Sequence, residues 1–202
     1  TTEIYTLSLH DALPILRPKS VMSYIETAKN DLVSPRDFSL HYGGFIEDIV
    51  AGIYPEYQKQ LKAQNAVDFG DLLYLTVKML EENEDVLEKY QEKFKYILID
   101  EYQDTNTVQY KFAKLISGKY NNICVVGDDD QGIYAWRGAD IKNIQQFEKD
   151  FPDVNVVKLE QNYRSTGNVI EAASSVISQN NLRVEKKLWT EKGNGEDRKS
   201  VV

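Results

Sequence analysis

Two adjacent carboxylates, Asp100 and Glu101, end the apolar run of the segment YILIDEYQDTN, residues 96–106. A buried strand holds the residues at its end rigidly, which suits side chains that do chemistry. The first carboxylate of such a pair can bind Mg²⁺, and the second can orient or deprotonate an attacking water. The alternative is that the segment caps a helix, with Asp104 or Thr105 as the capping residue.

Two more apolar runs lead into polar clusters of the same kind. NICVVGD, residues 122–128, continues into further acids and Gln131, and VNVVKLE, residues 154–160, continues into amides, Tyr163 and Arg164. One polar loop after a strand means little by itself, because loops are usually solvated. Three such loops in succession predict an active site.

The elements that must position these residues alternate between strand and helix. Helical stretches at 107–117 and 140–149 separate the apolar runs, a pattern that implies right-handed βαβ units and a parallel sheet. In such a sheet the carboxyl ends of the strands lie at one edge, where ligands bind. The predicted fold class is therefore α/β. Cys124, inside the second apolar run, is expected to be a small core residue.

The region before the first strand has helical spacing instead, from about residue 20 onward. Ser34, followed by proline, predicts the start of a helix. Pro55 is expected to kink or split the helix that contains it. Asp68 and Asp71 have the spacing of a capping box. This part of the chain is therefore predicted to form a helical subdomain.

Composition limits the classes of function. The 202 residues include one cysteine, which excludes a disulfide framework within the chain. Their formal net charge of −8 argues against binding nucleic acid by bulk electrostatics. The two histidines are isolated, so no zinc site is expected. No apolar run approaches the roughly 20 residues of a membrane span. Any nucleic-acid role must rest on a local site or on regions outside this chain.

Three segments resemble motifs II, III and IV of superfamily 1 DNA helicases of the UvrD/PcrA/Rep type: ILIDEYQDTN, VVGDDDQGIYAWRGAD and LEQNYRST. They occur in the family's order, VDFGDLL is similar to a further family segment, and the resemblance covers roughly residues 17–195. It implies a P-loop NTPase (RecA-like) parallel sheet with a helical insertion subdomain. It also implies ATP and Mg²⁺ as cofactors, single-stranded DNA and single-/double-strand junctions as partners, and repair proteins as further partners. The resemblance further implies that the protein is cytoplasmic and nucleoid-associated and does not contact a membrane.

The resemblance implies a role in ATP hydrolysis for each matched polar residue. Asp100 would bind Mg²⁺, and Glu101 would be the catalytic base. Gln131 would sense the γ-phosphate and couple the ATP state to the grip on DNA. Tyr163 would stack on adenine, and Arg164 would reach the γ-phosphate as an arginine finger.

The resemblance also implies a track for single-stranded DNA. Tyr134 and Trp136 would line it, with Trp136 stacking on a base, and Arg137 would lie beside it. Stacking of a base on an aromatic ring is worth about 1–3 kcal/mol and tolerates any sequence, which suits a motor that walks over all bases. The alternative for the two aromatics is a packed core pair, and for Arg164 a salt bridge to a neighbouring acid.

The implied function is that of a fragment of an ATP-dependent 3′-to-5′ DNA helicase and translocase of repair or replication restart. Alternatives are the motor of a helicase–nuclease complex and a non-catalytic module that binds DNA or a partner. A metal nuclease would explain the carboxylates but not the aromatic pair. The chain contains no G-x-x-x-x-G-K-[ST] segment, so it is expected to be inactive alone.

The ends of the chain are unlike the rest. Residues 1–15 and 197–202 resemble translated frames of a sequencing-library adapter and are set aside from fold reasoning. What lies between is expected to be an internal fragment of a longer protein that leaves apolar sheet surface exposed. By resemblance it divides into a helical 1B-like subdomain at 16–65, the later part of motor domain 1A at 66–160 and the start of motor domain 2A at 161–196.

Overall fold

The structure is a computed structural model that describes residues 16–180 and 186–195. The two segments predicted to be adapter-derived, 1–15 and 197–202, lie outside the described residues. Within the described ranges, no helix combines the length and the apolar character needed to cross a membrane. The architecture is mixed: helices dominate, and a small parallel sheet lies in the middle of the chain.

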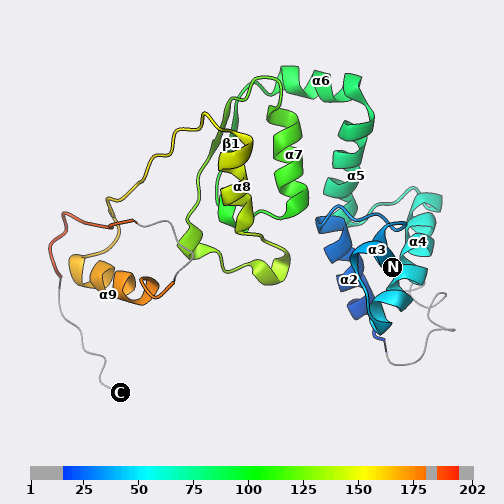
Figure 1. The fold of residues 1–202 in the computed structure, drawn as a ribbon, viewed down its shortest axis with the longest axis horizontal. Helices are drawn as coiled ribbons and strands as arrows, with labels where there is room; N and C mark the ends of the chain where they lie inside the picture. The colour runs from blue at the N-terminus through cyan, green and yellow to red at the C-terminus, as the bar shows by residue number, and fades with distance from the viewer. Residues whose placement is uncertain (1–15, 181–185, 196–202) are drawn as a thin grey trace.

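Helices α2 to α4 gather at one end of the molecule (Figure 1). α2 (Pro18–Asn30) packs against α4 (Phe45–Ala63), and the short α3 (Phe38–His41) lies beside α4. The helical character predicted for this region is confirmed. Its buried apolar side chains form one cluster, made of Val21, Ile25, Ala28, Val33, Phe38, Val50 and Tyr54.

One local prediction for this region is wrong, and a second is wrong in part, since of the kink or split expected at Pro55 only the split is excluded. Ser34 does not cap a helix directly: its hydroxyl donates to Asp37 Oδ2 at 2.6 Å, and α3 begins only after Asp37. Pro55 does not split α4, which runs through it without a break. Val50 and Leu61 are buried on either side of Pro55, so packing holds both halves of the helix in one element although proline lacks an N–H group.

The second half of the chain is joined to the bundle through α5 (Phe69–Glu82), which packs on both α2 and α7. The capping box predicted at the start of α5 is confirmed, since Asp71 N donates to Asp68 Oδ1 at 2.8 Å and Asp68 N donates to Asp71 Oδ2. The remaining elements are α6 (Glu84–Lys93), β1 (Ile97–Ile99), η1 (Tyr102–Asp104), α7 (Thr107–Ser117), β2 (Ile123–Val125), η2 (Asp129–Gln131), η3 (Ala135–Arg137), α8 (Lys142–Asp150) and α9 (Gly167–Ile177).

β1 and β2 form a parallel pair connected by α7, as the alternating pattern predicted. Leu98 pairs with Cys124 in register, and both side chains are exposed. The prediction that Cys124 is a core residue is therefore wrong. Side chains alternate between the two faces of a sheet, and the face that carries Leu98 and Cys124 is uncovered among the described residues.

The third predicted strand, residues 154–160, is not a strand in this structure. Its apolar side chains are largely exposed, with Val157 at 76% and Leu159 at 78%. A strand needs a neighbour for its backbone hydrogen bonds, and among the described residues this segment meets one only at its end, where Trp189 N donates to Glu160 O at 3.0 Å. The prediction of a strand is therefore wrong: the run has the apolar composition of a strand but no partner strand among the described residues. The chain then continues to α9, which lies apart from the other helices (Figure 1).

Candidate functional site

Asp100 and Glu101 follow β1 directly, and both side chains are exposed. Glu101 N donates to Asp100 Oδ1 at 2.9 Å. Glu101 has a left-handed backbone, with φ 51° and ψ 44°, which is uncommon for a residue with a side chain and is a form of strain concentrated at functional sites. The turn therefore places two carboxylates at the carboxyl end of a strand, as predicted.

Gln103 joins this turn to the end of β2. It is only 2% exposed, its Nε2 donates to Glu101 Oε2 at 2.6 Å, and its Oε1 accepts from Asp128 N at 3.0 Å. The partners fix the orientation of the amide, because a carboxylate only accepts and a backbone N–H only donates. A Cβ at Gly127 would lie 2.8 Å from Gln103 Oε1, so glycine permits this close approach.

Sequence reasoning did not single out Gln103, although it lies inside the quoted motif. Its partners Glu101 and Asp128 belong to two different loops, and their approach depends on the pairing of β1 with β2. The signal that was present in the sequence was weak: an amide two residues after the acid pair, and a glycine at the end of the second apolar run. Neither feature alone predicts a hydrogen bond between loops.

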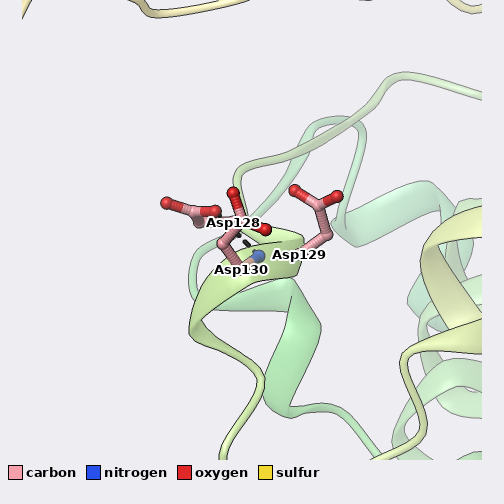
Figure 2. Close-up of side chains that lie close together, drawn as sticks. All are labelled: Asp128, Asp129 and Asp130. Carbon is pink, nitrogen blue, oxygen red and sulfur yellow. Dashed lines mark hydrogen bonds between the residues drawn. The ribbon is translucent and has the colours of Figure 1, made fainter. Parts of the chain in front are cut away.

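Three consecutive aspartates, Asp128, Asp129 and Asp130, lie on one turn at the end of β2 (Figure 2). Asp130 N donates to Asp128 Oδ1 at 3.0 Å, and their carboxylate oxygens lie within 4.8 Å of one another. Gln131, predicted to sense phosphate, is exposed and donates its Nε2 to Asp128 Oδ2 at 2.7 Å. Asp128 thus fixes the direction of the Gln131 side chain.

Lys186 supplies the counter-charge for these aspartates. Its Nζ pairs with Asp128, with Asp129 at 2.7 Å and with Asp130 at 3.5 Å. Burial raises the pKa of Asp128, but the hydrogen bonds from Lys186, Gln131 and the backbone of Asp130 outweigh it, so the pKa lies below its usual value. Burial lowers the pKa of Lys186, and its bonds to Asp128 and Asp129 outweigh that effect and raise it. No local sequence pattern points to Lys186, because its partners lie more than fifty residues away.

The aromatic residues predicted to line a DNA track lie on the loop after η2. The rings of Tyr134 and Trp136 have centroids 6.2 Å apart and planes inclined by 50°. Trp136 is 73% exposed, so the alternative of a packed core pair is wrong for this residue. Arg137 ends η3, and its side chain lies outside the described part of the structure.

Tyr163 and Arg164 are not brought to the acid pair by any contact among the described residues. Tyr163 is 74% exposed and donates its hydroxyl to Gln161 Oε1 at 2.7 Å. Arg164 is exposed, and its carbonyl accepts from Lys192 Nζ at 3.1 Å. The alternative of a salt bridge from Arg164 to a neighbouring acid is also not seen among these residues. The roles of both residues in binding ATP stay predictions.

The helix after the acid pair is capped by a residue that the sequence analysis passed over. Asn106, rather than Asp104 or Thr105, is the N-cap of α7: its Oδ1 accepts from Gln109 N at 3.0 Å, and Asn106 N donates to Gln109 Oε1 at 3.0 Å. Asp104 lies in η1 instead. Asp100, Glu101 and Asp104 therefore do not cap α7, and the chemical role of the acid pair stays a prediction.

A small parallel sheet with acids and amides at its strand ends, followed by an exposed aromatic loop, fits the helicase class, and comparison with known proteins agrees. The chain belongs to the UvrD/REP helicase family, since residues 3–152 match the UvrD/REP helicase N-terminal domain. It is 49% identical over 178 residues to the ATP-dependent DNA helicase PcrA of Bacillus subtilis, covering 88% of this chain and 24% of that protein.

Other relatives give the same result. The chain is 48% identical over 179 residues to ATP-dependent DNA helicase PcrA of Leuconostoc citreum and 49% identical over 179 residues to that of Staphylococcus aureus strain Mu50. Each match covers 89% of this chain and 24% of the relative. The chain thus spans about a quarter of the length of the curated relatives it matches.

Proposed function

We propose that this chain works as part of a longer ATP-dependent DNA helicase that moves 3′-to-5′ on single-stranded DNA, in repair or replication restart. The observation that carries the proposal is the pair of hydrogen bonds made by the Gln103 amide, which join the Glu101 turn to the Asp128 loop at one edge of the sheet. Gln131 and the exposed Trp136 follow on that same loop segment. Residues for hydrolysis and for stacking on bases therefore share one continuous structure.

The residues present fit Mg²⁺ and ATP. Asp100 offers an exposed carboxylate at a strand end, the hard oxygen donor that Mg²⁺ prefers, and Asp100 would hold the ion. Mg²⁺, when bound, neutralises charge on the phosphates. Glu101 would accept a proton from water, and its exposed carboxylate, held by Gln103, supports this role. The phosphate-cradling loop is absent from these residues, and we propose that another part of the helicase supplies it, together with the surfaces that Tyr163 and Arg164 face.

The test is to measure ATP hydrolysis by the full-length protein with and without single-stranded DNA, and the unwinding of duplexes with a 3′ or a 5′ tail. We expect stimulation by single-stranded DNA and unwinding of the 3′-tailed duplex. Glu101→Gln serves as the matched inactive control, expected to abolish turnover and leave ATP binding intact. Near-normal hydrolysis by that variant would contradict the role of Glu101 as base, and a wild-type protein without DNA-stimulated hydrolysis would contradict the proposal.

A further inference from the structure

The carboxyl end of α2 is held firmly in place by a buried ion cluster. Lys29, the next-to-last residue of α2, is fully buried, and its Nζ lies 2.6 Å from Asp68 Oδ2 and 2.8 Å from Asp71 Oδ1 at the start of α5. The two carboxylates restrict the movement of the Lys29 side chain, because separating the ammonium from them would leave unpaired charges buried away from water. The residue after Lys29 therefore has a well-defined position.

That residue is Asn30, and it contacts the segment that follows the acid pair. Asn106 Nδ2 donates to Asn30 Oδ1 at 3.0 Å, although the two residues are 76 positions apart. Asn106 is 9% exposed, and its Oδ1 is already used to cap α7. The bond therefore links the end of α2 to the start of the helix that directly follows the Asp100–Glu101 turn.

The aromatic loop lies against the same two asparagines. Gly138, with φ +86°, closes η3, and its N–H donates to Ala135 O at 2.9 Å. A Cβ at Gly138 would lie 3.7 Å from Asn30 Nδ2 and 3.9 Å from Asn106 Cβ. Because φ is positive here, glycine is the residue that adopts this backbone without strain. The backbone two residues after Trp136 thus lies beside Asn30.

Hydrogen bonds from residues beyond Gly138 tie the loop to the same place. Asp140 N donates to Thr105 O at 3.0 Å, and Asn143 Nδ2 donates to that oxygen at 2.8 Å. Three parts of the chain therefore meet within a few residues: the end of α2, the segment after the acid pair and the end of the aromatic loop. Trp136, two residues before Gly138 on this loop, is 73% exposed.

We propose that Asn30 is a positioning residue that couples the occupancy of the Trp136 loop to the geometry of the Asp100–Glu101 turn. DNA stacked on Trp136 pulls on the Gly138 backbone, and the asparagine pair passes that displacement to the start of α7 and the turn before it. Asn30 belongs neither to the acid pair nor to the aromatic loop, so its effect is on coupling rather than on the chemical step. The inference rests on the proposed function, because it needs both ATP hydrolysis and DNA binding.

The test replaces Asn30 in the full-length protein. Asn30→Ala removes the acceptor for Asn106 and the amide beside Gly138. We expect basal ATP hydrolysis to stay within about two-fold of wild type and its stimulation by a single-stranded oligonucleotide to fall about five-fold, the effect of one net hydrogen bond. Asn30→Asp keeps the acceptor for Asn106, and we expect it to retain most of the stimulation.

Asn83→Ala is the matched control. Asn83 Nδ2 donates to Met79 O at 2.8 Å at the end of α5, where the side chain is exposed, so its loss lowers the melting temperature without touching the junction. Stimulation should be unchanged in this variant. Asn30 is only half-buried at a helix end, and Asn30→Ser, whose hydroxyl is too short to reach Asn106, repeats the test if alanine prevents folding.

The outcomes are distinct. Loss of stimulation with basal hydrolysis retained, and rescue by aspartate, supports the inference. An equal fall in basal and stimulated rates, or full stimulation in Asn30→Ala and Asn30→Ser, overturns it while leaving the proposed function standing. A wild-type protein that is not stimulated by single-stranded DNA overturns the proposed function first, and this inference with it.

Discussion

Trp136 is 73% exposed although it is one of the largest apolar side chains in the chain. A solvent-exposed indole next to a second aromatic ring, that of Tyr134, is suited to stack on a nucleic-acid base. We expect Trp136→Ala in the full-length protein to raise the DNA concentration for half-maximal stimulation by about ten-fold or more, since stacking contributes about 1–3 kcal/mol per base. Trp136→Phe should retain most of the affinity. DNA titrations of ATP hydrolysis measure this, and an equal loss of basal and stimulated rates would mean that the ring does not act through DNA binding.

We predict a different effect for Gln103, because its side chain is buried and both its amide nitrogen and its amide oxygen form hydrogen bonds. Gln103→Leu fills the same space but leaves Asp128 N without its acceptor and Glu101 without its donor. The Glu101 carboxylate then loses the group that positions it, and misplacement of a catalytic group slows the reaction, so we expect turnover to fall by about ten-fold or more while ATP binding persists. Gln146→Leu, which removes an exposed amide bonded to Asp150 on α8, is the control. Steady-state hydrolysis assays measure turnover, and nucleotide-binding assays measure the affinity for ATP separately. Unchanged turnover in Gln103→Leu would show that the hydrogen bonds of Gln103 have no role in positioning Glu101.

At the scale of elements, the joint between α2 and α5 depends on one buried lysine. Lys29 has no exposed side-chain surface, and Asp71 has 1%. We expect Lys29→Met to lower the free energy of unfolding by about 3–5 kcal/mol, because the buried Asp71 carboxylate loses its counter-charge. Lys59→Met, which breaks the exposed pair with Glu56, should change it by less than about 1 kcal/mol. Denaturant unfolding of both variants checks this, and similar small losses would mean that the α2–α5 joint does not depend on the ion cluster.

The same joint predicts a dependence on pH. Burial raises the pKa of Asp68, but the bond from Lys29, the backbone N–H of Asp71 and Tyr57 outweigh it, so the folded pKa lies below the ordinary value of 3.8. A carboxyl with a depressed folded pKa stabilises the protein above its unfolded pKa, and that stability is lost as the pH falls through the folded value. The stability difference between wild type and Asp68→Asn should therefore be full near neutral pH and shrink below about pH 4. Asparagine still caps the helix, so a difference that stays constant with pH would contradict the charge argument.

Elements also show what the sequence could predict and what it could not. The capping box of Asp68 and Asp71 is readable because both partners lie within four residues, and α7 is readable from its own spacing. The strand at 154–160 was wrong because a strand forms only beside a neighbour, which no local pattern supplies. Lys29, Gln103 and Lys186 were missed for a related reason: their partners become neighbours only after the elements have packed.

For the whole molecule, the uncovered sheet face has the largest consequence. Leu98 in β1 is 74% exposed, Cys124 in β2 is exposed, and Tyr96, directly before β1, is 83% exposed. Apolar strands with open edges tend to pair with other chains, and contiguous apolar surface favours association. The expectation that these residues expose apolar sheet surface agrees with this geometry. In a longer protein, further structure could cover the same face.

We therefore expect the chain by itself to self-associate through this face. Leu98→Lys places a charge in the middle of β1 and should shift the chain toward monomer, since a charge on an exposed strand opposes pairing. Leu40→Lys is the matched control, because Leu40 is 83% exposed but lies on α3, away from the sheet. Sedimentation velocity over a range of concentrations measures the effect. Equal association of the wild type and both variants would place the contact elsewhere, whereas a monomeric wild type would mean that the exposed face does not drive association. A shift in Leu98→Lys alone would identify the β1–β2 face as the surface through which the chain associates.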